Sequence, residues 1–509
     1  MPALAAFILI TLPWLNPFSP GPTAQVAPLL FAWVCAAGVL LALAFDKQRG
    51  ENPRMVQAVA LAWVMAATLS AVIGLLQYFG ATSLLGQWVN HTELGQAFGN
   101  LRQRNQFASL LGIGLVAVLC LSLRAPTRNP WTLPTRSLAL LLALAALISA
   151  GNAASSSRTG LLQLALIAVL TLWWLRGRAA GDKRRVQAVL ATALAAYAVA
   201  TFALPLLAGL DPFGSGAWAR LRAGDAACAS RLTLWGNVLH LIARKPWGGW
   251  GWGELDYAHF ITLYPGNRFC DILDNAHNLP LHLAVELGLP AALALCSGAL
   301  WLIWRGQPWR ETEPTRQLAW AVLAVIGLHS LLEYPLWYGP FQMAAALSVW
   351  LLWWLPRPAA GADSYKHFRP LAFYLYGLIA LLIVACCSFA AWNYYLASQL
   401  YLPSAHRASA YREHTLQKVK SVWLYQDAVR FAELTTTPLT LENAAYLNAL
   451  AKDMLHFSPE ARVIEKVLDS AQLLGRTDEV AFYAARYAAA FAKDHAEWAK
   501  QNGSARAVP

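Results

Sequence analysis

One histidine stands where acid–base chemistry would be expected. His277 lies in Asp274-Asn-Ala-His-Asn278, where a long polar stretch meets an apolar block that begins near residue 283. An imidazole at such a boundary is shielded from bulk water but stays outside lipid, and in its neutral form it can accept the proton of an attacking hydroxyl. His277 could equally cap or anchor the following helix, and the residues alone leave both interpretations open.

The same stretch does not predict a metal site. His277 and His282 are five residues apart, whereas a helical zinc pair is spaced i, i+4, and no cysteine pair stands beside them. We expect no metal and no other cofactor.

Arginines next to apolar blocks are the second chemical signal. They are Arg102 and Arg104, which precede one block, Arg158 between two blocks, and Arg231 at the start of an amphipathic stretch. A guanidinium is permanently charged and donates several hydrogen bonds, which suits phosphate oxygens. Each arginine could instead anchor to anionic lipid headgroups. If they share one side of the membrane with His277, a common phosphate pocket is the more economical interpretation.

A carboxylate stands at another boundary. Glu333 and Tyr334 connect two apolar blocks, and a carboxylate at a membrane boundary usually serves a purpose. Glu333 could pair with one of the arginines, or it could be a solvated loop residue.

The composition predicts the elements that position these residues. The 509-residue chain is 58% hydrophobic and 13% charged, against about 25% charged residues in soluble domains. Its apolar residues form blocks long enough to cross a bilayer as helices. We predict an all-α polytopic membrane protein with about eleven transmembrane helices, near 3–18, 25–44, 55–79, 105–123, 137–150, 160–175, 186–207, 283–304, 317–332, 341–356 and 371–391.

Basic residues predict the orientation. The connections at 45–54, 124–136, 176–185, 305–316 and 357–370 hold 17 Lys and Arg in total, and the alternate short connections hold few. Because positive residues near span ends remain cytoplasmic, the N-terminus is expected inside and the tail outside. The net charge of +12 is then largely a signal of topology, and nucleic-acid binding is not expected.

Two long segments are expected on the outer side. The loop at about 208–282 should contain a helix over 231–244, with Leu232, Trp235, Val238, Leu239 and Ile242 on its apolar face. The glycine-rich run Pro246–Gly253 should follow it, either as a tight turn or where backbone approaches a ligand. Cys228 and Cys270 both lie in this loop and could pair in an oxidising compartment.

The tail after residue 391 is predicted to form helices near 404–433, 441–455, 460–474 and 478–499. These helices could form a tetratricopeptide-like module or a small helical cap. The predicted domains are therefore a membrane domain, 1–391, and an external helical domain, 392–509.

Several segments together resemble the bacterial O-antigen ligase and protein O-oligosaccharyltransferase superfamily. They are Gly99-Asn-Leu-Arg-Gln103, Ser156-Ser-Arg-Thr-Gly160, Ser230-Arg231 with Trp235, the glycines after Pro246, His277-Asn278-Leu-Pro-Leu281, and His329-Ser330 with Tyr334-Pro-Leu-Trp337. The external tail looks most like the protein-glycosylating, PglL-type class. The resemblance implies a GT-C-like membrane fold in the bacterial inner membrane.

The resemblance also implies an activity. It implies transfer of a glycan from undecaprenyl pyrophosphate, in the periplasm, to Ser or Thr of a protein such as pilin. His277 would be the general base, Arg231 and Arg158 would contact the pyrophosphate with Arg102 and Arg104 as further candidates, and Asn278, Glu333 and Tyr334 would support them. The alternatives are an O-antigen ligase that acts on lipid A-core, a Wzy-type polymerase, and a lipid flippase or transporter.

Overall fold

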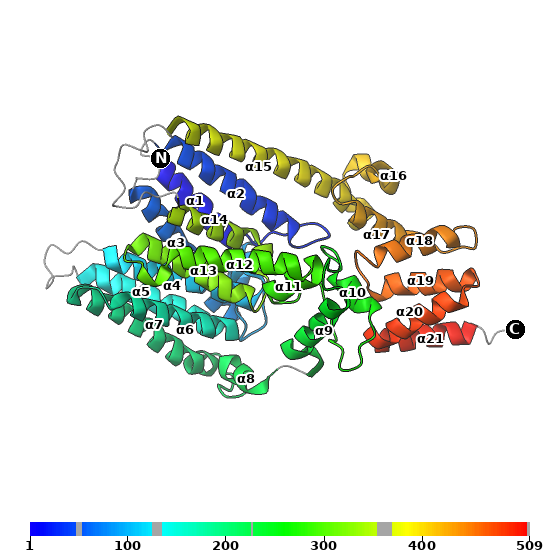
Figure 1. The fold of residues 1–509 in the computed structure, drawn as a ribbon, viewed down its shortest axis with the longest axis horizontal. Coiled ribbons are helices and arrows are strands. Elements are labelled where there is room, and N and C mark those ends of the chain that lie inside the picture. The colour runs from blue at the N-terminus through cyan, green and yellow to red at the C-terminus, as the bar shows by residue number, and fades with distance from the viewer. Residues whose placement is uncertain (47–52, 125–134, 225–226, 354–368, 506–509) are drawn as a thin grey trace. The chain divides into compact units, whose positions relative to one another are not determined.

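The computed structural model describes residues 1–46, 53–124, 135–224, 227–353 and 369–505, and the regular elements within them are all helices (Figure 1). Most of the basic connections at 45–54, 124–136 and 357–370 lies outside the described residues. The orientation that they predict therefore stays a prediction.

A helix lies at each of the eleven predicted spans. Within the described residues, seven helices are long and apolar enough to cross a membrane, and α1 and α5 are shorter apolar helices. The chain is therefore a multi-pass membrane protein by length and composition. The full count of eleven spans stays a prediction. The helices are α1 (Pro2–Leu15), α2 (Val26–Phe45), α3 (Pro53–Tyr78), α4 (Arg104–Arg124), α5 (Thr135–Ala154), α6 (Arg158–Leu175), α7 (Ala180–Leu207), α12 (Leu289–Gly306), α13 (Pro314–Ser330), α14 (Gly339–Trp353) and α15 (Arg369–Ser398).

The predicted span at 283–304 starts too early. Gly288 takes a left-handed backbone (φ 85°) and separates a short helix, α11 (Leu279–Leu287), from α12. The side chains of His282 and Glu286 on α11 are buried, and only α12 is long and apolar enough to be a span.

The chain forms two compact units, each of which is discontinuous in sequence. Unit 1 comprises Met1–Gly224 and Ile303–Phe389, and unit 2 comprises Asp225–Leu302 and Ala390–Pro509. In unit 1 the central helix is α4, which contacts α3, α5, α6, α7 and α13. The boundary predicted at residue 391, between a membrane domain and an external domain, is not tested by this division into units and stays a prediction.

Unit 2 contains the second half of the long loop and the tail. The loop carries α9 (Arg231–Arg244) and α10 (Leu255–Ile261), and α9 coincides with the predicted helix. Its buried residues are Leu234, Asn237, Val238, Leu241 and Ile242. The predicted apolar face was wrong in part, because Leu232 is 79% exposed and Leu239 is 55% exposed.

The tail is helical, but its first predicted helix was wrong. Residues 404–433 form short 3-10 turns, α16 (Thr415–Val419) and part of α17 (Gln426–Thr436), because His414 takes a left-handed backbone that breaks the helix. The last predicted helix is divided at Phe491. The remaining helices are α18 (Ala444–Met454), α19 (Ala461–Leu473), α20 (Thr477–Ala490) and α21 (Ala492–Ala505).

The loop and the tail share a core within unit 2. Phe260 of α10 is 2% exposed and packs among the buried residues of α17 to α20. The ring of Tyr257 stacks on His456 at 3.7 Å between centroids, and His456 Nδ1 lies 2.6 Å from Glu254 Oε2. Arg486 Nε donates to the carbonyl of Ile261 at 2.8 Å. The tail therefore supports the segment that leads to His277.

Candidate functional site

His277 sits on a constrained turn at the start of α11. Its backbone is left-handed (φ 49°), and its N–H donates to Asn275 Oδ1 at 2.9 Å. The next residue, Asn278, caps α11 by accepting from the N–H of Leu281 at 3.1 Å. The half-buried imidazole is thus fixed at a helix N-terminus. The side chain that caps α11 is thus that of Asn278.

Helix α9 braces this turn. Trp235 Nε1 donates to the carbonyl of Ala276, next to His277, at 3.2 Å. Arg231 is the first residue of α9, and Ser230 caps the helix by accepting from the N–H of Thr233. Because residues four apart share one face of a helix, Arg231 and Trp235 project from the same side of α9. Unit 2 therefore orients an arginine, a helix N-terminus and the His277 turn together.

A disulfide joins the same two segments. Cys228 and Cys270 are bonded, with their Cα atoms 5.3 Å apart, and Cys270 N donates to the carbonyl of Cys228. Cys228 comes three residues before Arg231, and Cys270 comes seven before His277. The bond thus ties the start of α9 to the chain that leads into the His277 turn.

The glycine-rich run packs against the end of α11. Trp250 N donates to the carbonyl of Val285 and Gly251 N to that of Glu286. Gly249 is left-handed (φ 69°), and a Cβ there would lie 2.2 Å from the carbonyl oxygen of Glu286. Gly249 is thus needed for close approach of protein backbone, in agreement with the tight-turn interpretation of the run.

Below the turn, α11 buries a second histidine. His282 Nε2 lies 3.4 Å from Glu286 Oε2, and both side chains are at most 3% exposed. Burial, and to a lesser degree the nearby His277, lowers the pKa of His282 to about 4. Burial raises the pKa of Glu286 to about 7. His282 is therefore neutral at physiological pH and belongs to the interior of α11.

In unit 1 a second arginine repeats the arrangement of Arg231. Arg158 is the first residue of α6, and Ser157 caps that helix by accepting from the N–H of Gly160 at 2.9 Å. Ser157 Oγ also donates to Asn105 Oδ1 at 2.6 Å. Asn105 follows Arg104, the first residue of α4, so two helix N-termini that each begin with arginine lie side by side. Positive helix ends with guanidinium groups favour an anion.

A third arginine joins this cluster. Arg220 of α8 (Gly216–Ala223) donates to the carbonyl of Ser156, which is left-handed (φ 52°). Arg220 also lies near enough to Arg104 for their charges to repel each other. An anion bound among Arg104, Arg158 and Arg220 would relieve that repulsion. We call these three residues the unit 1 arginine cluster.

Glu333 is part of the same polar network. It is 8% exposed, so it is not a solvated loop residue, and its Oε1 accepts from Asn105 Nδ2 at 3.0 Å. Asn105 therefore links Glu333 to Ser157 through its two amide atoms. The ring of Tyr334, beside Glu333, stacks on the ring of Tyr338, with 6.0 Å between the ring centroids.

Further along α4, buried polar residues form a second group of hydrogen bonds in the core of unit 1. Ser109 Oγ lies 2.8 Å from His329 Nδ1 and accepts from Gln163 Nε2 at 2.7 Å. The motif segments of α4, α6 and α13 are thus joined by buried hydrogen bonds.

Arg102 has a bracing role in the structure. Its guanidinium donates to the carbonyl of Pro17 and the hydroxyl of Ser19, which holds the segment after α1. Its backbone is left-handed (φ 59°). Because its guanidinium is engaged by the segment after α1, Arg102 is not included in the unit 1 arginine cluster.

Two residues of the site were missed in the sequence. Asn105 directly follows Arg104 but was given no role, because its two partners are distant in the chain. Arg220 belongs to a region of the long loop with no recognisable motif. Its one available signal was its position on the side of the membrane expected to be poor in basic residues.

Three family models match the segments that carry these residues. One described as O-antigen ligase matches residues 143–296, which include Arg158, Arg231 and His277. One described as protein glycosylation ligase matches 97–121, and one described as the C-terminal part of virulence factor membrane-bound polymerases matches 317–504. These segments of the chain are thus similar to O-antigen ligases and protein glycosylation ligases.

Two curated proteins, both from Acinetobacter baylyi, are similar to this chain. A general O-oligosaccharyltransferase is 24% identical over 64% of this chain and 55% of its own length. A ComP-specific O-oligosaccharyltransferase is 24% identical over 59% of this chain and 51% of its own length. The chain thus spans about half the length of these relatives. No solved structure matches it.

Proposed function

We propose that this protein is an O-oligosaccharyltransferase. It would move a glycan from undecaprenyl pyrophosphate to a Ser or Thr hydroxyl of a periplasmic protein such as a pilin. The similarity to two O-oligosaccharyltransferases supports this reaction class. The observation that carries the assignment of the base is the position of His277, on a capped, left-handed turn that Trp235 ties to the arginine-bearing helix α9.

The proposed chemistry is a single displacement at the anomeric carbon. A nitrogen of His277 accepts the proton of the acceptor hydroxyl as its oxygen bonds to the anomeric carbon. The bond from that carbon to the pyrophosphate oxygen breaks, and undecaprenyl pyrophosphate leaves with the electron pair. Guanidinium groups stabilise the charge that develops on the pyrophosphate, because they are fixed and need little reorganisation during the reaction.

Arg231 and Arg158 are the proposed pyrophosphate contacts, each at a capped helix N-terminus. Arg104 and Arg220 belong with Arg158, and Arg102 is the weakest candidate. The proposed location is the bacterial inner membrane, with the N-terminus in the cytoplasm and His277 and the tail in the periplasm.

Two related reactions share this donor chemistry. An O-antigen ligase would use a sugar hydroxyl of lipid A-core, and a polymerase would use a sugar of a second lipid-linked glycan. The matches described as O-antigen ligase and as membrane-bound polymerase favour these as the alternatives.

Transfer in a defined host tests the proposal. We would express the protein with a lipid-linked glycan pathway and a candidate pilin, in a bacterium that lacks its own ligase. We expect glycan on the pilin, and His277→Ala should reduce transfer by roughly 100-fold to 10,000-fold, the usual contribution of a general base.

The variant His282→Ala changes a buried residue of the same short helix. Its transfer rate and protein level show the effect of disturbing α11 without changing His277. His277→Ala should insert and accumulate like the wild type. Near-normal transfer by His277→Ala would remove the base assignment, and glycan on lipid A-core alone would favour the ligase alternative.

A further inference from the structure

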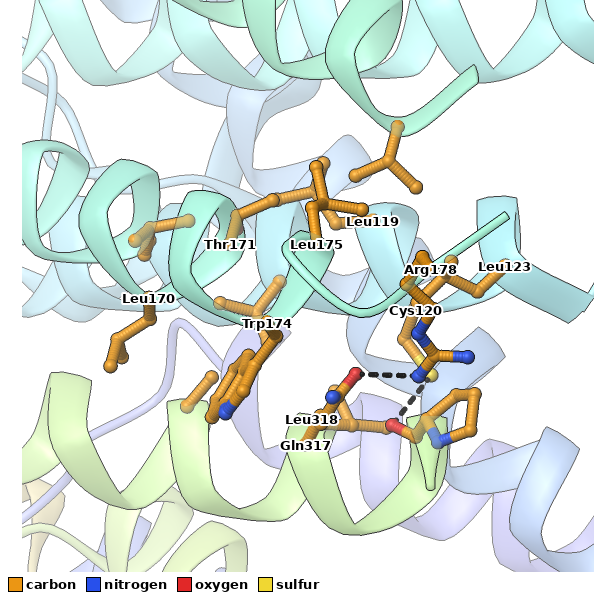
Figure 2. Close-up of a pocket in the computed structure, with 15 residues that line it drawn as sticks. Leu119, Cys120, Leu123, Leu170, Thr171, Trp174, Leu175, Arg178, Gln317 and Leu318 are labelled. Atoms are coloured by element: carbon orange, nitrogen blue, oxygen red, sulfur yellow. Dashed lines mark hydrogen bonds between the residues drawn. The ribbon is translucent and has the colours of Figure 1, made fainter. Parts of the chain in front are cut away.

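A partly open cavity lies in unit 1 among α4, α6 and α13 (Figure 2). Apolar side chains form most of its wall, among them Leu119, Leu123, Leu170, Trp174, Leu318 and Ala321. Arg178, in the short connection after α6, is the one charged residue that lines it. The cavity therefore combines an apolar chamber with a single cation.

The polar end of this cavity is held in place by hydrogen bonds. Trp174 Nε1 donates to the carbonyl of Pro308 at 2.8 Å. Arg178 Nη2 donates to the carbonyl of Thr312. It also donates to Gln317 Oε1 at 3.1 Å, and Figure 2 shows this second bond. Both acceptors of Arg178 are neutral oxygens, so these bonds orient the guanidinium without cancelling its charge.

The cavity and the unit 1 arginine cluster lie at opposite ends of α6. Arg158 begins the helix, and its 18 residues correspond to about 27 Å of rise, close to the thickness of the hydrocarbon core. The connection after α6, residues 176–185, contains five Lys and Arg, the composition expected of a cytoplasmic connection. The cavity thus belongs to the membrane face opposite to that of Arg158.

We propose that this cavity binds one acyl chain of an anionic phospholipid, with the headgroup phosphate at Arg178. An apolar cavity disfavours water, and within a bundle of membrane-spanning helices a lipid chain is the apolar molecule at hand to fill it. Along α4 the lining runs from Val116 to Leu123, or about 10 Å, which suits the part of a chain nearest the headgroup. The charge on Arg178 selects an anionic headgroup, since basic side chains at the cytoplasmic surface attract anionic lipids.

The donor lipid is a less suitable occupant. Its pyrophosphate is proposed to bind at the other end of α6, and the guanidinium at the cavity would then have no phosphate partner. The phospholipid site does not depend on the proposed transfer reaction, so the two proposals can fail separately.

Lipid binding to the purified full-length protein tests the site. Native mass spectrometry in detergent would compare phosphatidylglycerol with phosphatidylcholine of the same chains. We expect one tightly retained phosphatidylglycerol and at least about tenfold weaker phosphatidylcholine, because the neutral headgroup lacks the net charge that Arg178 attracts. His277→Ala should retain the lipid like the wild type.

Matched variants locate the site. Thr171→Phe fills the cavity, whereas Leu172→Phe adds bulk at a neighbouring position that is 51% exposed. Arg178→Gln removes the cavity charge, whereas Arg176→Gln removes a charge from the same connection but not from the cavity. We expect Thr171→Phe and Arg178→Gln each to weaken phosphatidylglycerol by about tenfold or more, and the two controls to leave it unchanged.

Three results would overturn the proposal. Equal binding of the two phospholipids would show that no charge is recognised. Unchanged binding in both cavity variants would place the lipid elsewhere. Displacement of phosphatidylglycerol by undecaprenyl phosphate at equal concentration would identify the polyprenyl chain as the occupant.

Discussion

At the scale of single residues, strained backbone coincides with the predicted site segments. Arg102, Ser156 and His277 are three of the five non-glycine residues with positive φ among the described residues. Each stands two residues before the first residue of a helix. These helices are α4, α6 and α11, which begin at Arg104, Arg158 and Leu279. Such backbone is unfavourable by itself, and it persists where surrounding contacts fix it, which is common at functional sites. At Ser156 and His277 this strain coincides with the segments that carry the proposed site residues.

Arg231→Lys tests the guanidinium at the start of α9. A lysine keeps the charge but loses the planar pair of donors, so we expect transfer to fall by about 100-fold, as for loss of one transition-state donor. The measurement is the rate of glycan transfer at saturating acceptor. Arg244→Lys, at the other end of α9, should be nearly as active as the wild type. A fully active Arg231→Lys enzyme would argue against a phosphate contact at this position.

Asn105→Ala tests the link between Glu333 and Ser157. Removing the amide leaves two polar groups of a largely buried network without this partner, and the expected loss of stability is about 1–3 kcal/mol. Because Ser157 orients the first turn of α6, the variant should also raise the KM for the lipid-linked donor. We would measure thermal unfolding and the dependence of rate on donor concentration. An unchanged KM together with lower stability would leave Asn105 a purely structural residue.

At the scale of elements, short helices and turns orient the chemistry. Helices α9 and α11 are joined by the indole of Trp235, by the Cys228–Cys270 disulfide and by the glycine-rich turn against α11. None of these elements is long enough to be stable alone, so their positions come from the contacts among them. The order of the His277 turn therefore depends on the Trp235 hydrogen bond, the disulfide and the glycine-rich turn.

Cys228→Ser tests the strongest of these links. The disulfide closes a segment with a sequence separation of 42 residues, and its loss should destabilise unit 2 by about 2–4 kcal/mol. Transfer should fall because the start of α9 is less firmly held beside the His277 turn. Thermal unfolding and transfer would be compared with Cys296→Ser, which changes an unpaired cysteine of α12. Equal behaviour of the two variants would mean that the disulfide has no role in ordering the site.

At the scale of the whole molecule, the helical tail completes the folding of the long loop. Phe260 reaches the core of the tail, and Glu254, Tyr257 and His456 form a polar contact beside it. Asp256 lies within this same segment, and burial raises its pKa to about 7. The packing of the loop on the tail should therefore respond to pH.

The sign of that response follows from proton binding. Between its ordinary pKa of 3.8 and about 7, Asp256 keeps a proton in the folded protein that it loses in the unfolded chain. The folded state then binds more protons, so the contribution of Asp256 to stability is largest below this range and declines as pH rises through it. Asp256→Asn cannot titrate.

We expect the melting temperature of the wild type, minus that of Asp256→Asn, to decrease from pH 5 to pH 8. Taking this difference removes the opposing effect of His259, whose pKa burial lowers to about 3. A difference that is constant with pH would contradict the burial of a protonated Asp256.

The sequence by itself predicted the membrane class, the approximate position of a helix at each proposed span, and the limits of α9. These features depend on local apolar length, capping residues and glycine, which act over a few neighbouring positions. Only the tertiary structure decided that Asn105 joins Glu333 to Ser157, that α9 buries Leu234 and Leu241 in place of Leu232 and Leu239, and that the tail packs on α10. Those choices depend on side-chain shape and hydrogen-bond geometry between residues up to 228 positions apart, which periodicity along the chain does not encode.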